Sequence, residues 1–395
     1  MGLGTNRGAL ASRMRFDGTA MKNRHWSPRR GLVRFIAGLV AFGCMDATEA
    51  TSLQTRNVIF VTTDGLRWQE VFQGADQSLI RDVQGSVVDA RTMRREFWRD
   101  TPEARREALM PFLWSEIAKR GQVFGNQPKG SIARVANASR VSYPGYSEML
   151  TGWADPTITD NVNAPNPNVT VLEWLNGRPA FAGRVAVFAN WELFPLIVNR
   201  DRSKLPVWTG RERTTEETGS PRLALLEQVS TDLPPVWRNT TFDAFIHHAA
   251  IGHLREHKPR VLWVAYMETD EWGHRNQYGL YLHAARRVDG FLKRLWETAQ
   301  AMPEYRGTTT LLVTTDHGRG SKPSDWTTHN RDTEGSEGTW IAAMGPDTPP
   351  LGERSNVGPV TQSQIAATLA ALLGEDYGAA NPKAAPPIAQ VVGKR

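Results

Sequence analysis

Cysteine is almost absent from this sequence of 395 residues, which contains only Cys44. A single cysteine excludes an intrachain disulfide framework and a zinc site built from several thiolates. The N-terminal part also lacks an apolar run that could cross a bilayer. Its uncharged stretch at 35–45 has 11 residues, whereas a membrane-spanning helix needs about 20. No transmembrane span is therefore expected.

A strong charge imbalance is missing once the N-terminal segment is set apart. The whole sequence carries a formal net charge of +6, but residues 1–50 hold 8 Lys or Arg and 3 Asp or Glu. The remaining residues hold 39 basic and 38 acidic side chains, a net charge of +1. This balance does not indicate a nucleic-acid partner. Hydrophobic residues make up 40% of the sequence, which is enough for a substantial core in one large or two ordinary domains.

The first 50 residues have the pattern of an export signal with an upstream extension. Basic residues precede the apolar stretch, and small residues after it offer a cleavage site following Ala50. Arg29 and Arg30 match a twin-arginine signal in part, so the Sec and Tat routes both stay open. A disordered basic tail on a cytoplasmic protein is the alternative. We expect an exported, periplasmic or secreted protein with one α/β domain at 51–380 and a loose, Pro-rich tail at 381–395.

Short apolar runs alternate with helical patterns through the rest of the chain. The clearest runs lie within 58–64, 184–191, 260–270 and 308–316. This alternation predicts an α/β fold with a mostly parallel central sheet and helices on both faces. In such sheets, ligands bind beyond the carboxyl ends of the strands. Asp64, Asp270 and Asp316 stand at three of these ends.

The stretch at 136–152 reads as a hydroxyl group mounted at the start of a short helix. Ser142 has the position of an N-cap, Pro144 can occupy the first turn, and Gly152 can end the helix. The N–H groups of a first turn and the positive end of the helix dipole favour an alkoxide at Ser142 and an anion beside it. A serine cap alone is more often part of an ordinary surface helix.

Three strand ends and one later loop carry residues of the types that bind zinc-like ions. Each has an ordinary explanation by itself as a turn, a capping pair or a surface histidine. The candidate ligands are Asp64, Asp270, His274, Asp316, His317 and His329. Six ligands are too many for one tetrahedral zinc, but two ions about 3.5 to 4 Å apart could use them all, together with the Ser142 oxygen. Two metal ions and a hydroxyl group predict phosphoryl transfer.

Four motifs in order resemble the alkaline phosphatase superfamily, and most closely its nucleotide pyrophosphatase and phosphodiesterase branch. They are TTDGLRW, SYPGYSEMLTG, DEWGH and DHGRG with a following histidine, and they extend over about 56–345. The resemblance implies one α/β domain, two zinc ions and a small-molecule phosphate ester as substrate. It makes Ser142 the nucleophile that forms a covalent phosphoryl intermediate. The implied ligands are Asp270, His274 and His329 for one ion, and Asp64, Ser142, Asp316 and His317 for the other.

The same resemblance implies an asparagine that donates to a phosphate oxygen about twenty residues after the nucleophile. Asn161 and Asn163 both fit this spacing, and Asn161 is preferred. The sequence departs from the branch in having Ser142 where threonine is typical. It also has Tyr146 where sulfatases need an arginine to mature their formylglycine, which disfavours a sulfatase. The alternatives are a sulfatase-like hydrolase, a phosphotransferase like the mutase relatives, and a metal-binding surface protein without activity. Manganese or iron could replace zinc in this ligand set.

Overall fold

The computed structural model describes residues 52–81, 86–210 and 220–393. The predicted export signal at 1–50 lies outside this described part. Within it, no helix combines the length and the apolar character that a membrane span requires.

An eight-stranded sheet forms the centre of the described chain, with the strand order β10-β2-β9-β7-β1-β6-β4-β5. A smaller sheet has the order β11-β3-β8. The strands, in chain order, are β1 (Asn57–Thr63), β2 (Gln122–Phe124), β3 (Ser131–Arg134), β4 (Val185–Ala189), β5 (Val207–Trp208), β6 (Val261–Tyr266), β7 (Thr309–Thr314), β8 (Gly338–Thr339), β9 (Ile341–Met344), β10 (Gly352–Glu353) and β11 (Val357–Thr361).

Parallel pairing joins the central strands of the large sheet. β1 pairs in parallel with both β6 and β7, and β4 pairs in parallel with both β6 and β5. Only β9 among these strands runs antiparallel to its neighbours, β7 and β2. The predicted fold class, a mostly parallel α/β sheet, is therefore confirmed.

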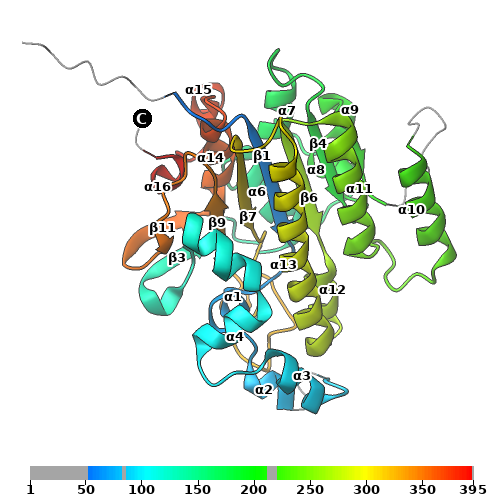
Figure 1. Cartoon of the computed structure of the whole chain (residues 1–395), viewed down its shortest axis with the longest axis vertical. Helices are drawn as coiled ribbons and strands as arrows, with labels where there is room; N and C mark the ends of the chain where they lie inside the picture. The colour runs from blue at the N-terminus through cyan, green and yellow to red at the C-terminus, as the bar shows by residue number, and fades with distance from the viewer. Residues whose placement is uncertain (1–51, 82–85, 211–219, 394–395) are drawn as a thin grey trace, which may run out of the picture. The chain divides into compact units, whose positions relative to one another are not determined.

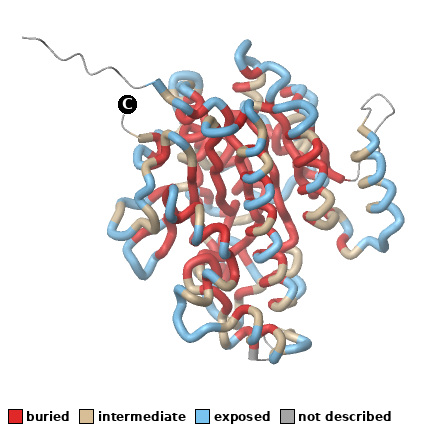
Figure 2. The backbone as a smooth tube through the Cα atoms, viewed as in Figure 1, coloured by how far each residue is buried: buried red, intermediate tan, exposed pale blue. Residues whose placement is uncertain are grey.

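Helices cover both faces of the sheet. Every residue of β1 is therefore buried. Ile59 and Val61 belong to one apolar core, and Val58 and Phe60 belong to the other, as the alternation of side chains along a strand requires. Figure 1 shows α11 and α13 over one face and α6, α7 and α14 over the other. The tube in Figure 2 is accordingly buried along the central strands and exposed on the outer sides of these helices.

The described helical segments are mostly short, and α13 is the longest at 24 residues. They are α1 (Trp68–Gln73), α2 (Gln77–Arg81), α3 (Ala90–Phe97), α4 (Pro102–Leu109), η2 (Leu113–Ile117), α5 (Ala118–Arg120), η3 (Gln127–Lys129), α6 (Ser142–Thr151), α7 (Val171–Asn176), α8 (Phe194–Ile197), α9 (Arg200–Ser203), α10 (Pro221–Asp232), α11 (Asp243–His257), α12 (Glu268–His274), α13 (Tyr278–Ala301), η5 (Gln362–Gln364), α14 (Ile365–Leu372), α15 (Tyr377–Ala380) and α16 (Ala389–Val392).

The C-terminal segment differs from its prediction, because Ile388, Val391 and Val392 are buried against the domain. Ile388 and Val391 are buried in the same core as α14, and the Ile388 N–H donates to Thr368 Oγ1 at 2.9 Å. The Ala385 N–H donates to the carbonyl of Gly152 at 2.8 Å. The prolines suggested a loose tail. Burial of the apolar side chains, however, lowers the free energy by more than the loss of conformational entropy raises it.

Candidate metal centre

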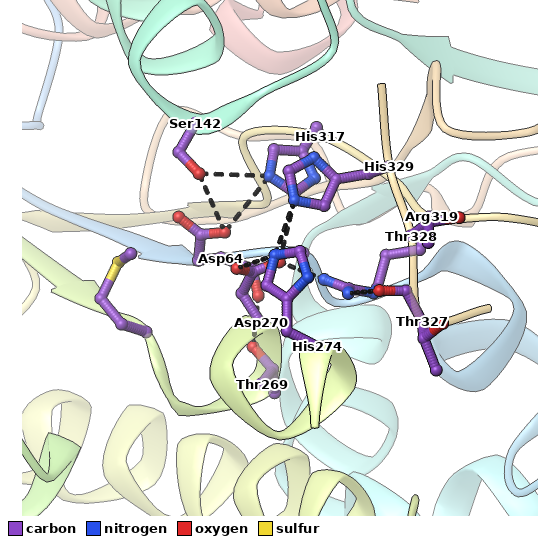
Figure 3. Close-up of polar contacts among 12 residues, drawn as sticks. Asp64, Ser142, Thr269, Asp270, His274, His317, Arg319, Thr327, Thr328 and His329 are labelled. Atoms are coloured by element: carbon purple, nitrogen blue, oxygen red, sulfur yellow. Dashed lines mark hydrogen bonds and ion pairs between the residues drawn. The ribbon is translucent and has the colours of Figure 1, made fainter. Parts of the chain in front are cut away.

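The three strand-end carboxylates lie together because their strands are neighbours in matched register. Thr63 of β1 pairs with Tyr266 of β6, and Thr62 pairs with Thr314 of β7, so the three strands end at one level. Asp64 follows β1 directly, Asp270 lies in α12 after β6, and Asp316 lies two residues beyond β7. All three side chains are buried. The structure thus brings the acidic candidates to one edge of the sheet, as Figure 3 shows for Asp64 and Asp270.

One group of side chains surrounds Asp64. His317 Nε2 lies 3.3 Å from Asp64 Oδ1 and 3.4 Å from Asp316 Oδ2. Ser142 Oγ lies 3.5 Å from Asp64 Oδ1 and 3.3 Å from His317 Nε2. Asp64, Asp316 and His317 each present a ligand atom within 4.8 Å of the others. These distances place the serine hydroxyl directly beside a potential cation site (Figure 3).

A second group surrounds Asp270. His274 Nε2 lies 3.0 Å from Asp270 Oδ2, and His329 Nε2 lies 3.5 Å from Asp270 Oδ1. The two histidines approach each other at 3.0 Å between their Nε2 atoms. The rings of His317 and His329 stack with centroids 3.7 Å apart, so the two groups adjoin. The structure therefore gathers all six candidate ligands, including His329 from its distant loop, and Figure 3 labels each of them except Asp316.

The histidine rings are oriented so that Nε2 faces the cluster. His317 Nδ1 lies 2.8 Å from the carbonyl of Gly318, and His329 Nδ1 lies 2.9 Å from the carbonyl of Arg140. A carbonyl only accepts, so Nδ1 is the donor in each of these contacts and Nε2 is left for the cluster. Such outer hydrogen bonds commonly orient the histidine ligands of metals.

The surrounding protein balances the negative charge of Asp64 and Asp316 only in part. Asp316 Oδ1 accepts from the Gly65 N–H at 3.1 Å, but its buried Oδ2 has no hydrogen-bond donor among the described residues. Burial, and then the charge of Asp270, raises the pKa of Asp64 well above its ordinary value. Burial and the charge of Asp64 do the same to the pKa of Asp316. Two buried carboxylates that repel each other, one of them with an oxygen that lacks a donor, fit divalent metal binding.

Ser142 is the first residue of α6, which differs from its predicted place as the N-cap. Val141 has the extended N-cap conformation instead, and its own side chain makes no capping hydrogen bond. The Ser142 hydroxyl is therefore directed at Asp64 and His317 and does not cap its own helix. Gly145 permits this approach, because a Cβ at that position would lie 2.6 Å from the carbonyl oxygen of Asp316. Gly152 ends the helix in the left-handed conformation, as predicted.

A cavity of about 430 Å³ opens beside Ser142. Both asparagine candidates line it, together with Asp270, His274 and other residues. Asn161 Oδ1 accepts from the Tyr143 N–H in the first turn of α6 at 2.9 Å. This contact leaves the Asn161 amide NH2 as a donor toward the cavity, whereas no comparable contact to α6 involves Asn163 within the described residues. The geometry thus favours the preferred candidate, Asn161.

Two further side chains at the site escaped the sequence analysis. The Tyr146 hydroxyl donates to Asp64 Oδ2 at 3.1 Å. The Thr269 hydroxyl donates to the carbonyl of Asp64 and lies 3.0 Å from Thr63 Oγ1. Tyr146 could have been found, since it lies one helical turn after Ser142 on the same face. Thr269 follows no sequence pattern that would indicate this contact.

The arginines next to the motifs bind protein groups within the fold. Arg67 pairs with Glu70 and donates to the carbonyl of Gly320. Arg140 pairs with Glu337. Arg319 is fully buried and joins Asp270 to the carbonyls of Trp326 and Thr327. Burial raises the pKa of Asp270, but the charges of His274 and Arg319 lower it by more. The pKa of Asp270 is therefore held well below its ordinary value. Arg319 therefore fixes Asp270 relative to the loop that carries His329.

Replacing Arg319 with methionine should lower the free energy of unfolding by about 3 to 5 kcal/mol, because it leaves Asp270 without its buried ion-pair partner. Urea denaturation of the metal-free protein measures this change. Lys322→Met is the matched control, since Lys322 forms an ion pair with Glu334 at the exposed surface, and it should change stability little. Equal effects of the two substitutions would contradict the structural role of Arg319.

Comparisons with known proteins agree with this centre. The Metalloenzyme superfamily profile matches residues 236–333, a segment that contains five of the six candidate ligands, Asp270, His274, Asp316, His317 and His329. The comparison with curated proteins found no match.

Solved structures share the fold at low sequence identity. A PafA alkaline phosphatase variant is 11% identical with a TM-score of 0.52, covering 86% of this chain and 99% of that chain. The phosphonate monoester hydrolase SpPMH from Silicibacter pomeroyi is 13% identical with a TM-score of 0.51, covering 85% and 76%. The lipoteichoic acid synthase LtaP from Listeria monocytogenes is 10% identical with a TM-score of 0.52, covering 86% and 74%. The chain thus shares the fold of these three proteins, and its segment 236–333 is similar to the Metalloenzyme superfamily.

Proposed function

We propose that this protein is a metal-dependent hydrolase of phosphate diesters that acts through a covalent phosphoserine at Ser142. The observation that carries the proposal is the position of the Ser142 hydroxyl. It lies at the first residue of a helix, beside a cavity, and within 3.5 Å of both Asp64 and His317. An ordinary helix serine has no reason to contact a buried carboxylate and an oriented histidine.

Two zinc ions suit the ligand set. Asp64, Asp316 and His317 would hold one ion beside Ser142, and Asp270, His274 and His329 would hold the other. When bound, such ions lower the pKa of a hydroxyl group and neutralise charge on phosphoryl oxygens. The ring of His317 adjoins both groups, since it stacks on His329 and contacts Asp64.

The protein residues then account for two displacement steps. Ser142 Oγ forms a bond to phosphorus while the bond from phosphorus to one alcohol oxygen breaks, and the Ser142 proton is lost. The departing alcohol takes up a proton. Water next forms a bond to phosphorus as the bond to Ser142 Oγ breaks, which restores the hydroxyl group. The Asn161 NH2 group donates to a phosphoryl oxygen, held in place by its contact with the Tyr143 N–H.

The charge of the cavity favours diesters over monoesters. No lysine or arginine occurs among the described residues that line it, and Arg67, Arg140 and Arg319 are engaged elsewhere. A phosphate diester carries one negative charge near neutral pH, whereas a monoester carries up to two. Without a protein cation to balance the second charge, a monoester binds less favourably.

Hydrolysis of three nitrophenyl substrates by the zinc-loaded protein tests the proposal. We expect bis(4-nitrophenyl) phosphate to be cleaved with a kcat/KM at least about 10-fold above that for 4-nitrophenyl phosphate. The sulfate ester should be slowest, because Tyr146 occupies the position that sulfatase maturation needs for arginine. A preference for the monoester would overturn the diester assignment, and a preference for the sulfate would overturn phosphate chemistry. A protein that binds metal and cleaves none of them would be a binding protein.

We also infer that this chemistry takes place after export. The support is the sequence pattern of residues 1–50 alone, in which basic residues precede a short uncharged stretch and a small-residue cleavage site. Fractionation of cells that express the full chain, followed by N-terminal sequencing, tests this inference. A cytoplasmic protein with its first 50 residues intact would contradict it.

A further inference from the structure

The cavity beside Ser142 has a wall built from three separate parts of the chain. The wall consists of Trp191 and Glu192 after β4, Asn239 and Thr240 before α11, and Glu271 in α12. None of these residues belongs to the candidate metal ligands. Because Ser142 opens into the same cavity, a substituent of a substrate bound at Ser142 must meet this wall.

Hydrogen bonds hold the wall in one arrangement. Trp191 and Thr240 form an antiparallel bridge, and the Glu192 N–H donates to the carbonyl of Asn239 at 3.3 Å. The Thr240 hydroxyl donates to Glu271 Oε1 at 2.8 Å. The Glu271 carboxylate is therefore oriented by the neighbouring segment, and Glu271 lines the cavity.

Glu271 is half-buried and lines the same cavity as the aromatic residue Trp191. Trp191 is 9% exposed, so most of its indole is covered and only a small part reaches the cavity. No positively charged side chain accompanies Glu271 among the described residues of the wall. A carboxylate in that setting repels a second anionic group, and it attracts a cation that an aromatic ring can also stabilise.

We propose that Glu271 and Trp191 form a subsite for a cationic ammonium group on the alcohol portion of the substrate. The natural substrate is then a zwitterionic phosphodiester, whose phosphate lies at Ser142 and whose ammonium group lies against Glu271. This assignment rests on the proposed phosphodiesterase function and specifies its substrate class. Glu192 adds a second negative charge at the exposed rim of the same wall.

A pair of nearly isosteric diesters isolates the effect of the positive charge. One is 4-nitrophenyl phosphorylcholine, and the other is 4-nitrophenyl 3,3-dimethylbutyl phosphate, in which a neutral carbon replaces the quaternary nitrogen. The zinc-loaded protein should cleave the choline ester with a kcat/KM at least about 10-fold above that of the neutral ester. This comparison uses only the unaltered protein, so it does not depend on the folding of any variant.

The variant Glu271→Gln then assigns the preference to one side chain. It should lower the ratio of the two kcat/KM values at least about 5-fold, because the neutral amide attracts the ammonium group less. Glu297→Gln is the matched control, since Glu297 is exposed on α13 and pairs with Lys293. It should preserve the wild-type ratio.

The outcomes separate this inference from the proposed function. Cleavage of both esters at similar rates would overturn the ammonium subsite and leave the diesterase function standing. A higher kcat/KM for the 4-nitrophenyl ester of glycerol phosphate than for the choline ester would also overturn the subsite, in favour of a polyol. If Glu271→Gln leaves the ratio of the two kcat/KM values unchanged, Glu271 is not part of the ammonium subsite. If neither ester is cleaved, the proposed diesterase function itself fails.

Discussion

Replacing Ser142 with alanine should reduce kcat for a phosphate diester by at least about 10⁴-fold, because the substitution removes the atom to which phosphorus is transferred. The bound metal should stay near its normal content, since Asp64, Asp316 and His317 still surround the site. Steady-state kinetics and metal analysis of the same preparation measure the two quantities. The unaltered protein, quenched during turnover, should also carry phosphate on the peptide that contains Ser142.

Two other substitutions on α6 control this result. Ser142→Thr keeps a hydroxyl group at the same position and should retain far more activity than alanine. Ser147→Ala removes a buried serine of the same helix, whose Oγ accepts from Asn166 Nδ2 at 3.1 Å. It should lower the free energy of unfolding by about 1 kcal/mol and leave kcat largely unchanged. Substantial turnover by Ser142→Ala would mean that water attacks phosphorus directly, and the covalent mechanism would be wrong.

Replacing Asp316 with asparagine should remove bound metal and reduce kcat/KM by at least about 10³-fold. The reason is the buried Oδ2 atom of Asp316, which lies 3.4 Å from His317 Nε2 and has no described donor. An amide supplies no negative charge to a cation at that point. Metal content after gel filtration, compared with that of the exposed control Asp332→Asn, measures the loss.

The same variant should show opposite stability effects with and without metal. Burial and the neighbouring Asp64 raise the pKa of Asp316 above its ordinary value of 3.8. In the metal-free protein this carboxylate therefore destabilises the fold increasingly as the pH rises from that value toward the raised pKa. Without metal, Asp316→Asn should thus be more stable at pH 7 than the unaltered protein. Added zinc should strongly stabilise the unaltered protein but not the variant. Lower stability of the variant in both states would indicate a purely structural role.

The sequence was most informative where local patterns decide the structure. The run within 58–64 predicted a buried strand, and β1 forms there. Gly152 was predicted to end the helix of Ser142, and it does so. These features depend on side chains within a few residues of one another, so that their spacing in the sequence is their spacing in the structure.

Local patterns failed where packing competes with them. Ser142 was expected to cap α6, but its hydroxyl contacts side chains from two other strand ends. The prolines after 381 suggested a loose tail, but Ile388 and Val391 reach the core against α14. In both cases a partner that is distant in the sequence offers a better interaction than the local one, and the sequence does not reveal that partner.

By itself the sequence determined an α/β fold and the residue types of a candidate metal centre, since hydrophobic periodicity and short motifs are local properties. Only the tertiary structure decided that β6, β1 and β7 are neighbours, which brings Asp64, Asp270 and Asp316 to one edge. It alone brought Glu271 and Trp191 to the lining of one cavity with Ser142. The physical reason is that strand order results from packing of the whole core, and side chains from separate strand ends become neighbours only after that packing is complete.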